Sequence, residues 1–246
     1  MDTMNYVAVS HQMALQRQMA VISNNVANMN TPAYKREQAL FEATLSTMPS
    51  APVHSARPVS FVLDQGMTRD LTQGQFISTD DPLHVALLND GYFTVTTPEG
   101  ERAYTRNGQF RLDGEGFLVT EAGARVLDDA GQPIQFAPEE AHINIADDGT
   151  ISSNLGPRGR LGITGFENEF ALTKIGDTLL TGEGGEMLPA DQVRVKAGMF
   201  EGSNVKPVVE MTNMIEVLRS YQSTTRLLER YNDVRQQGIE RLARVQ

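Results

Sequence analysis

The stretch SNNVANMNTPAYKREQ, residues 23–38, carries four asparagines within seven positions, at 24, 25, 28 and 30. Asparagine is a poor helix former because its side chain competes for backbone hydrogen bonds. Pro32 also disfavours helical geometry at Thr31, the residue that precedes it. The stretch therefore predicts that an N-terminal helix ends near residues 28–30, where the chain turns toward a connector.

Upstream of this stretch, residues 1–30 carry apolar side chains that recur mostly three, four or seven positions apart. Such spacing places the apolar side chains along one side of a helix, with Gln, Ser and Asn on the remainder of its surface. The predicted stripe consists of Met4, Val7, Ala8, Leu15, Met19, Ile22, Val26 and Met29.

The C-terminal end of the chain shows a second helical pattern, with Pro207 suited to a first turn and Ser203 or Asn204 available as a cap. A helix from Pro207 to Val245 would be about 55–60 Å long, which is more than a globular domain of this size needs. Its apolar side chains alternate steps of four and three, which predicts an imperfect heptad seam. The seam positions are Met214, Leu218, Tyr221, Thr225, Leu228, Asn232, Arg235, Ile239 and Leu242.

Between the two helical patterns, residues 83–197 contain short apolar-rich runs separated by turn dipeptides such as Asp90-Gly91 and Asn107-Gly108. Glycine after Asn or Asp supplies the positive φ that tight hairpins require, so the region predicts an antiparallel β domain. Residues 46–80 are less regular. Prolines at 49, 52 and 58 predict an extended connector, and residues 65–77 can pair as a strand or hairpin.

Together these patterns predict an α+β fold. Long N- and C-terminal helices form a coiled-coil-like core domain, next to a central antiparallel β-rich domain. The predicted division is an N-terminal core helix at 1–30, a connector with extended segments at 31–80, a central β domain at 81–200, and a C-terminal core helix at 201–246 that packs with the first. Because both apolar stripes are narrow, we expect helices of neighbouring subunits to cover them. Periodicity alone equally allows both helices to pack on the β domain of their own chain.

Composition excludes several classes of function. The chain has 246 residues, a formal net charge of −10 and no cysteine. The negative charge argues against nucleic-acid binding, and the missing cysteine excludes disulfides and thiolate chemistry. No apolar run reaches the length of about 18 residues that a membrane span requires, so no membrane insertion is expected. The N-terminus lacks the basic and apolar regions of a cleavable secretory signal, which predicts another export route if the protein leaves the cytoplasm.

The sequence predicts no catalytic, cofactor-binding or metal site, and therefore no enzyme. The four histidines lack the i, i+4 spacing of a metal site. Aspartate pairs at 80–81, 128–129 and 147–148 lie beside Pro or Gly in predicted turns, where aspartate is common for backbone reasons. Two alternatives stay open on residues alone: a carbohydrate-acting enzyme that uses one of these pairs, and a monomeric β-domain binding module.

The stretch ISNNVANMNTPAYKRE resembles the N-terminal signature of bacterial flagellar rod and hook proteins, which reads roughly NNxANxxTxGYK. Ala33 stands where that family usually has glycine, which leaves open whether the turn uses a positive φ there. Residues 81–127, with the motifs GYF, YTR and GxF, resemble the family's central segment. Residues 201–221, EGSNVKPVVEMTNMIEVLRSY, resemble its closing motif. The length and the single short β domain are most like a proximal rod protein, with distal rod and hook-type axial proteins as alternatives.

The resemblance implies a structural subunit of the flagellar basal-body rod, which polymerises helically through its terminal helices into the drive shaft that crosses the periplasm. It implies copies of the chain and other rod proteins as partners, and export through the flagellar type III apparatus without a cleaved signal peptide. Contact with the surrounding rings or with peptidoglycan is left open. The expected subunit-interface residues are Leu15, Met19, Ile22, Asn24, Asn25, Val26, Asn28, Asn30, Met211, Met214, Ile215, Leu218, Tyr221 and Leu228.

Two hypotheses follow for the chain ends. The four asparagines are expected to satisfy backbone and inter-subunit hydrogen bonds where the helix turns toward the connector, because Asn carries both a donor and an acceptor on a short stem. The alternative is a frayed helix end with simple Asn caps. The thin apolar stripes also predict that both ends are largely disordered in the free monomer and fold on joining the rod.

Overall fold

The computed structural model describes residues 3–46, 59–140, 142–176 and 178–243. The chain divides into two compact units. The helical unit comprises Met1–Ala27, Arg36–Asp70 and Lys206–Gln246, and the β body comprises Asn28–Lys35 and Leu71–Val205. The prolines at 49, 52 and 58, on which the extended connector was predicted, lie outside the described residues.

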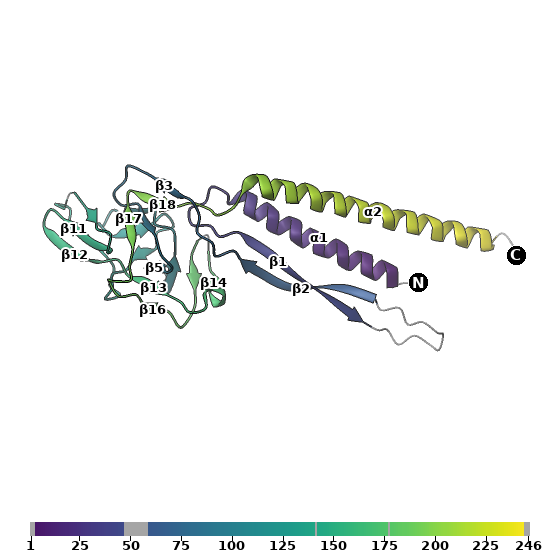
Figure 1. Ribbon diagram of the computed structural model, residues 1–246, viewed down its shortest axis with the longest axis horizontal. Helices are drawn as coiled ribbons and strands as arrows, with labels where there is room; N and C mark the ends of the chain where they lie inside the picture. The colour runs from purple at the N-terminus through teal and green to yellow at the C-terminus, as the bar shows by residue number, and fades with distance from the viewer. Residues whose placement is uncertain (1–2, 47–58, 141, 177, 244–246) are drawn as a thin grey trace. The chain divides into compact units, whose positions relative to one another are not determined.

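The helical unit contains the helices α1 (Thr3–Ala27) and α2 (Pro207–Ala243) and the strands β1 (Glu37–Ser46) and β2 (Val59–Arg69). The two helices lie side by side, and α1 also packs against both strands of the antiparallel β1–β2 pair (Figure 1). The register of that pair shifts between Leu40 and Phe41, which are opposite Gly66 and Asp64. The extra residue, Gln65, is therefore part of a β-bulge.

The β body consists of short strands and one 3₁₀ turn, η1 (Glu169–Ala171). Its strands are β3 (Phe76–Ser78), β4 (Val85–Leu87), β5 (Tyr92–Thr96), β6 (Arg102–Thr105), β7 (Phe110–Leu112), β8 (Leu118–Thr120), β9 (Arg125–Val126), β10 (Asn144–Ile145), β11 (Thr150–Ser153), β12 (Gly156–Arg160), β13 (Ile163–Gly165), β14 (Thr173–Lys174), β15 (Leu180–Thr181), β16 (Glu186–Met187), β17 (Val195–Ala197) and β18 (Met199–Glu201).

All strand pairs of the body that the structure describes are antiparallel. The largest sheet has the order β14-β15-β6-β5-β9-β8-β7, with β13 joining β5 and β16 joining β13. A three-stranded sheet (β10-β11-β12) and two pairs (β17–β4 and β18–β3) complete the body. This agrees with the turn dipeptides, because short hairpins connect antiparallel neighbours.

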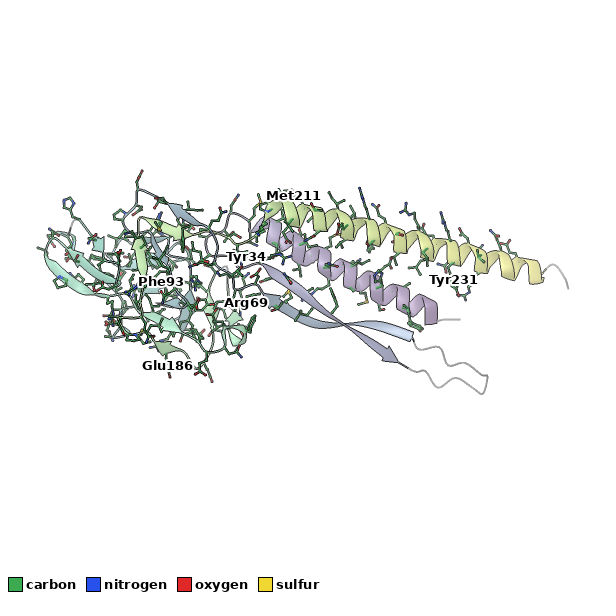
Figure 2. The ribbon with its side chains drawn as sticks, in the orientation of Figure 1. Tyr34, Arg69, Phe93, Glu186, Met211 and Tyr231 are labelled. Carbon is green, nitrogen blue, oxygen red and sulfur yellow. The ribbon has the colours of Figure 1, made fainter. Side chains whose placement is uncertain are left out.

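One continuous hydrophobic core lies inside the body. Phe93, which is labelled in Figure 2, is fully buried and meets Phe110 edge to face at 5.0 Å between ring centroids. Buried side chains of β4, β8, β13 and β17 join this cluster, among them Leu87, Leu118 and Ile163. A smaller cluster forms around Tyr92, Tyr104 and Leu172.

The predicted fold class is wrong. Helices were expected at both ends, and α1 and α2 lie there, but they do not form a coiled-coil-like core domain. Within the described residues the chain has two α-helices against 18 strands, and its main core lies in the β body. The contact between the helices buries few apolar side chains, and part of the surface of α1 packs instead on β1 and β2. Heptad spacing could not reveal this, because a helix that packs on a hairpin shows the same periodicity.

Candidate functional site

The seam between α1 and α2 is apolar over only part of its length. Leu15, Ile22 and Val217 are buried there, and the half-buried Met19, Val26, Met214 and Tyr221 pack around them. Nearer the start of α1 the contacts become polar. Gln12 Nε2 donates to Thr225 Oγ1 at 3.0 Å, and Gln16 Nε2 lies 3.4 Å from the Tyr221 hydroxyl. A seam of this kind holds two helices together but buries little apolar surface.

At the end of α1, Asn25 pairs with the backbone at the beginning of β1. Its Nδ2 donates to the Glu37 carbonyl oxygen at 2.8 Å, and its Oδ1 accepts from the Glu37 N–H at 2.9 Å. Asn25 is 1% exposed. A side-chain amide offers the same donor and acceptor as a backbone residue, so Asn25 occupies the place of a neighbouring strand residue beside Glu37.

Glu210, in the first turn of α2, lies fully buried at the same point. Its Oε2 accepts from Asn25 Nδ2 at 3.1 Å, and its Oε1 accepts from Arg36 Nε at 2.6 Å. The carboxylate also lies near the positive end of the helix macrodipole, which favours its charge. We call Asn25, Arg36, Glu37 and Glu210 the Glu210 cluster. It joins α1, the start of β1 and α2 at one buried position inside the helical unit.

The turn at 28–35, which belongs to the β body, follows α1 directly. The Thr31 N–H donates to the Asn28 carbonyl at 3.1 Å, and the Thr31 hydroxyl reaches Asn28 Oδ1 at 3.1 Å. Ala33 adopts a φ of 57° and donates its N–H to the Glu201 carbonyl at 2.8 Å. The turn therefore uses the positive φ that was left open on sequence grounds, although alanine adopts it at a cost that glycine does not bear.

A second buried glutamate lies in the β body, at the end of β18. Glu201 Oε1 accepts from Lys35 Nζ at 2.7 Å and from the Gly74 N–H at 2.9 Å, while Oε2 accepts from Arg106 Nε at 2.9 Å. The other guanidinium nitrogens of Arg106 donate to backbone carbonyls of residues 89 and 91, at 3.0 and 3.1 Å. We call Lys35, Arg106 and Glu201 the Glu201 cluster. Because each charge has several partners, these contacts offset the cost of removing the charges from water.

The surroundings shift the pKa values of two members of the Glu201 cluster. Burial opposes the ionisation of Glu201, but the charges of Arg106 and Lys35 outweigh it and hold the pKa of Glu201 below its ordinary value. Burial lowers the pKa of Lys35, and the neighbouring Glu201 carboxylate offsets part of that effect.

The structure brings together only part of the residue set expected at a subunit interface. Leu15, Ile22 and Asn25 are buried within the helical unit, and Met19, Val26, Met214, Tyr221 and Leu228 are half-buried. Asn28 is half-buried in the turn at 28–35. The exposed members are Asn24, Asn30, Met211, Ile215 and Leu218.

Sequence reasoning missed Val217, Glu210 and Arg36. The seam on α2 follows positions 210, 214, 217 and 221, so Val217 is buried where Leu218 was expected. Glu210 occupies one of these seam positions, where an apolar residue is expected. An acidic side chain at such a position indicates that a buried hydrogen-bond or charge partner lies opposite it. Of the two consecutive cations at the end of the turn, Lys35 and Arg36, it is Arg36 that pairs with Glu210.

Side chains of the three aspartate pairs accept backbone hydrogen bonds within turns. Asp81 Oδ1 accepts from the Leu83 N–H, Asp128 Oδ1 accepts from the N–H groups of residues 130 and 132, and Asp148 Oδ1 accepts from the Thr150 N–H. These contacts match the turn interpretation of the pairs. Across the described part of the chain, no three His, Asp or Glu side chains are grouped so as to hold a metal ion. Neither described helix combines the length and the apolar character needed to cross a membrane.

Three family models match successive parts of the chain: "Flagella basal body rod protein" over residues 6–35, "Flagellar hook protein FlgE/F/G D1 domain" over 86–153, and "Flagellar basal body rod FlgEFG protein C-terminal" over 196–241. The chain is 35% identical to the flagellar basal-body rod protein FlgF of Caulobacter vibrioides over 246 residues, which is 100% of both chains. It is 35% identical to FlgF of Salmonella typhimurium over 93% of each chain. It is also 32% identical to the rod protein FlgG of Buchnera aphidicola subsp. Schizaphis graminum, over 85% of this chain and 88% of that protein.

Proposed function

The chain belongs to the flagellar basal-body rod protein family, and on this premise we propose that it is a structural subunit that polymerises helically through its terminal helices. The observation that carries the proposal is identity of 35% along the entire length of an FlgF protein, with family models matching both helices and the β body. The polymer is the axial rod of the basal body, which transmits torque across the periplasm.

The helical unit supports polymerisation because it leaves apolar surface uncovered. Val208, Met211, Ile215 and Leu218 of α2 are exposed, as are Tyr6, Val9 and Met13 of α1. Solvent-facing helices normally carry polar side chains on such faces. Neighbouring subunits would remove these side chains from water, which is the contribution that the seam within one chain does not supply.

Within the family we propose the role of FlgF, the proximal rod protein. The FlgF relatives named above match over 93–100% of this chain, whereas the FlgG relative matches over 85%. The FlgG role in the distal rod is the second candidate, because the identity to FlgG is only slightly lower. Antibody labelling of isolated basal bodies separates the two, since label on the cell-proximal half of the rod supports the FlgF role and label on the hook-side half supports the FlgG role.

The partners follow from the role. Copies of the chain and other rod proteins are its neighbours in the rod, and the flagellar type III export apparatus carries the chain to the periplasm. The relatives are named as flagellar basal-body rod proteins, which supports a function without catalysis or cofactor. The division of the chain at 1–30, 31–80, 81–200 and 201–246, and the interface residues named from sequence, stay predictions within this proposal.

The test uses the bacterium that encodes the chain, with the gene deleted and then replaced. We expect deletion to abolish swimming and the full chain to restore it, with the chain recovered in purified basal bodies. A chain that lacks residues 207–243 should be made but should not be recovered there. Unimpaired swimming after deletion, or a full chain that is absent from basal bodies, would contradict the proposal.

A further inference from the structure

Each helix of the helical unit carries an exposed apolar stripe in addition to the seam. The α1 outer stripe consists of Tyr6, Val9 and Met13, of which Tyr6 and Met13 are 64% and 65% exposed. The α2 outer stripe consists of Val208, Met211, Ile215 and Leu218, and Val208 at its start is 78% exposed. Met211 is labelled near the start of α2 in Figure 2. Both stripes lie in one unit but on different helices.

The outer stripes have the spacing of a helix-packing face. Their members are separated by steps of three and four residues on α1, and of three, four and three on α2. Side chains spaced in this way line one side of a helix and fit between those of a facing helix. At about 100° per residue, the α2 outer stripe lies roughly 110° around the helix from the seam positions 210, 214, 217 and 221. The stripe is therefore a second packing face, separate from the one that α1 of the same chain occupies.

Neither outer stripe contains a charged side chain. Across Thr3–Ala27, Arg17 is the only Lys, Arg, Asp or Glu residue, so α1 can lose contact with water along most of its surface without desolvating a charge. The α2 outer stripe is free of charge as far as Leu218. On the same side of α2, Gln222, Arg226 and Glu229 follow. The apolar face thus has a defined end, about 15 Å along the helix from its start.

Two unlike stripes on one subunit also decide the type of contact. A contact between two like stripes is isologous and by itself joins only two copies. A contact between the stripe of α1 and the stripe of α2 in the next copy is heterologous, and it generates an open helical array when the rotation between copies does not close into a ring. The proposed function requires an open array.

We propose that the α1 outer stripe of one copy packs on the α2 outer stripe of the next copy of the same chain. This pairing rests on the proposed function and specifies its contact. Met13 then lies against the centre of the α2 stripe, between Met211 and Ile215. The occupant is a second copy rather than another protein because one chain presents both faces. The two faces have similar lengths, about 10 and 15 Å, and neither carries a charged side chain that the other would have to bury.

The chain contains no cysteine, so an introduced pair provides its only thiols. The test combines Met13→Cys with Met211→Cys and oxidises purified basal bodies. We expect covalent dimers and longer multimers, because each copy carries both halves of the contact. The matched control combines Met13→Cys with Ser220→Cys, since Ser220 is exposed on the side of α2 opposite the outer stripe. That control should remain largely monomeric.

A second cysteine pair keeps the test decisive if the first pair impairs folding or assembly. Val9→Cys with Ile215→Cys places both thiols on the same two stripes and should give the same ladder. If both pairs are recovered in basal bodies and neither cross-links, or if the Ser220 control cross-links equally, the stripe pairing is overturned while the rod function stands. If the unsubstituted chain is absent from basal bodies, the proposed function and the pairing are overturned together.

Charge exchange provides an independent measure. Met13→Glu and Met211→Lys should each lower recovery in basal bodies by roughly tenfold, because each buries a lone charge in the contact. Both changes in one chain should restore most of the recovery, since the introduced carboxylate of one copy then faces the introduced ammonium of the next copy. A double variant that is recovered no better than either single variant overturns the pairing.

Discussion

The two units of this chain differ in how completely each buries its own apolar surface. In the β body, strands from 85 to 195 contribute to one continuous cluster whose members, such as Phe93 and Ile151, are almost inaccessible to water. In the helical unit, α1 and α2 span 25 and 37 residues, but among the side chains that the structure describes their seam buries only three apolar ones, Leu15, Ile22 and Val217. The body therefore has the contacts of an independently stable fold, whereas the helical unit leaves apolar surface that, in the proposed function, other subunits cover.

A parallel difference separates the two buried glutamates. Glu201 in the body is held by two cations and a backbone N–H, whereas Glu210 in the helical unit is held by one cation and the Asn25 amide. Arg36, the cation of the second cluster, is also 22% exposed, so water screens its charge. Loss of one partner should therefore cost more in the body than in the helical unit.

The largest expected contrast is in amide hydrogen exchange of the dilute, full-length chain. Amides of β5 and β6 should exchange at least roughly a thousandfold more slowly than those of α1 and α2, because helices with a thin seam open locally. Exchange followed by mass spectrometry on the monomer and on purified basal bodies measures this. The helices should become protected only in the assembly. Equal protection of helices and body in the monomer would show that the helical unit is complete by itself.

Arg106→Leu should strongly destabilise the body. It leaves the buried Glu201 carboxylate with one cation and removes donors from two backbone carbonyls, so we expect the free energy of unfolding to fall by about 3–5 kcal/mol. Urea unfolding of the full chain, followed by circular dichroism in the β region, gives the value. Lys196→Met, which removes the exposed contact to Asp147 at 3.4 Å, is the matched control and should change stability by less than about 1 kcal/mol. Similar losses for both variants would contradict the role of the buried cluster.

Asn25→Leu should act on the helical unit and leave the body intact. The change leaves the N–H and C=O of Glu37 without the Asn25 amide, at a cost of about 1–3 kcal/mol. We expect the variant to lose rod assembly and swimming while the exchange protection of the body is unchanged. Asn24→Leu, at the exposed neighbouring position, is the control for stability and should have little effect on helix content. Intact assembly of the Asn25 variant would show that the Glu210 cluster is dispensable.

The Glu201 cluster also predicts a dependence on pH. Because the pKa of Glu201 is lowered in the folded chain, its ionisation contributes stability that is fully present above the ordinary pKa of 4.5 and is lost as the pH falls through the lowered folded value. The difference in urea midpoint between the unsubstituted chain and Glu201→Gln should therefore be larger at pH 7 than in acid. A difference that does not narrow below pH 4.5 would contradict this contribution.

The smallest expected effect is an increase in the stability of the body. Ala33→Gly should stabilise the body by up to about 1 kcal/mol, because glycine adopts the φ of 57° without steric cost and this outweighs its larger entropy in the unfolded chain. Ala20→Gly in the exposed middle of α1 is the matched control and should lower helix stability by a similar amount. A loss of stability in the Ala33 variant would show that the turn tolerates alanine without strain.

Sequence patterns located the elements better than they described their packing. The Asn-rich stretch and Pro32 placed the end of α1 near residues 28–30, and α1 ends at Ala27 because the following turn is closed by Thr31. Turn dipeptides predicted the antiparallel strands of the body, since positive φ at glycines such as Gly91 is a local property. The packing of α1 on β1 and β2 depends on contacts between distant segments, and periodicity does not record which surface a stripe will meet.

In the candidate site, too, the sequence predicted local features but not the contacts between distant segments. Residues at apolar spacing, such as Ile22 and Met214, were predictable as packing residues because their position on a helix is fixed by the chain itself. The buried ion pairs were not, because Lys35 and Glu201 are 166 positions apart and Arg36 and Glu210 are 174 apart. The family resemblance drew attention to these segments, but only the folded chain shows which charges meet.

Lys35 and Arg36 are consecutive residues, yet they bind glutamates in different units, Glu201 in the body and Glu210 in the helical unit. Ten residues separate Asn25, which lies in the last turn of α1, from Arg36, and both belong to the Glu210 cluster. Both cations follow residues 28–34, so an insertion or deletion in that stretch changes the length of chain between Asn25 and both of them together. The number of residues in this turn is therefore constrained by Asn25 on one side and by the contacts to two buried glutamates on the other.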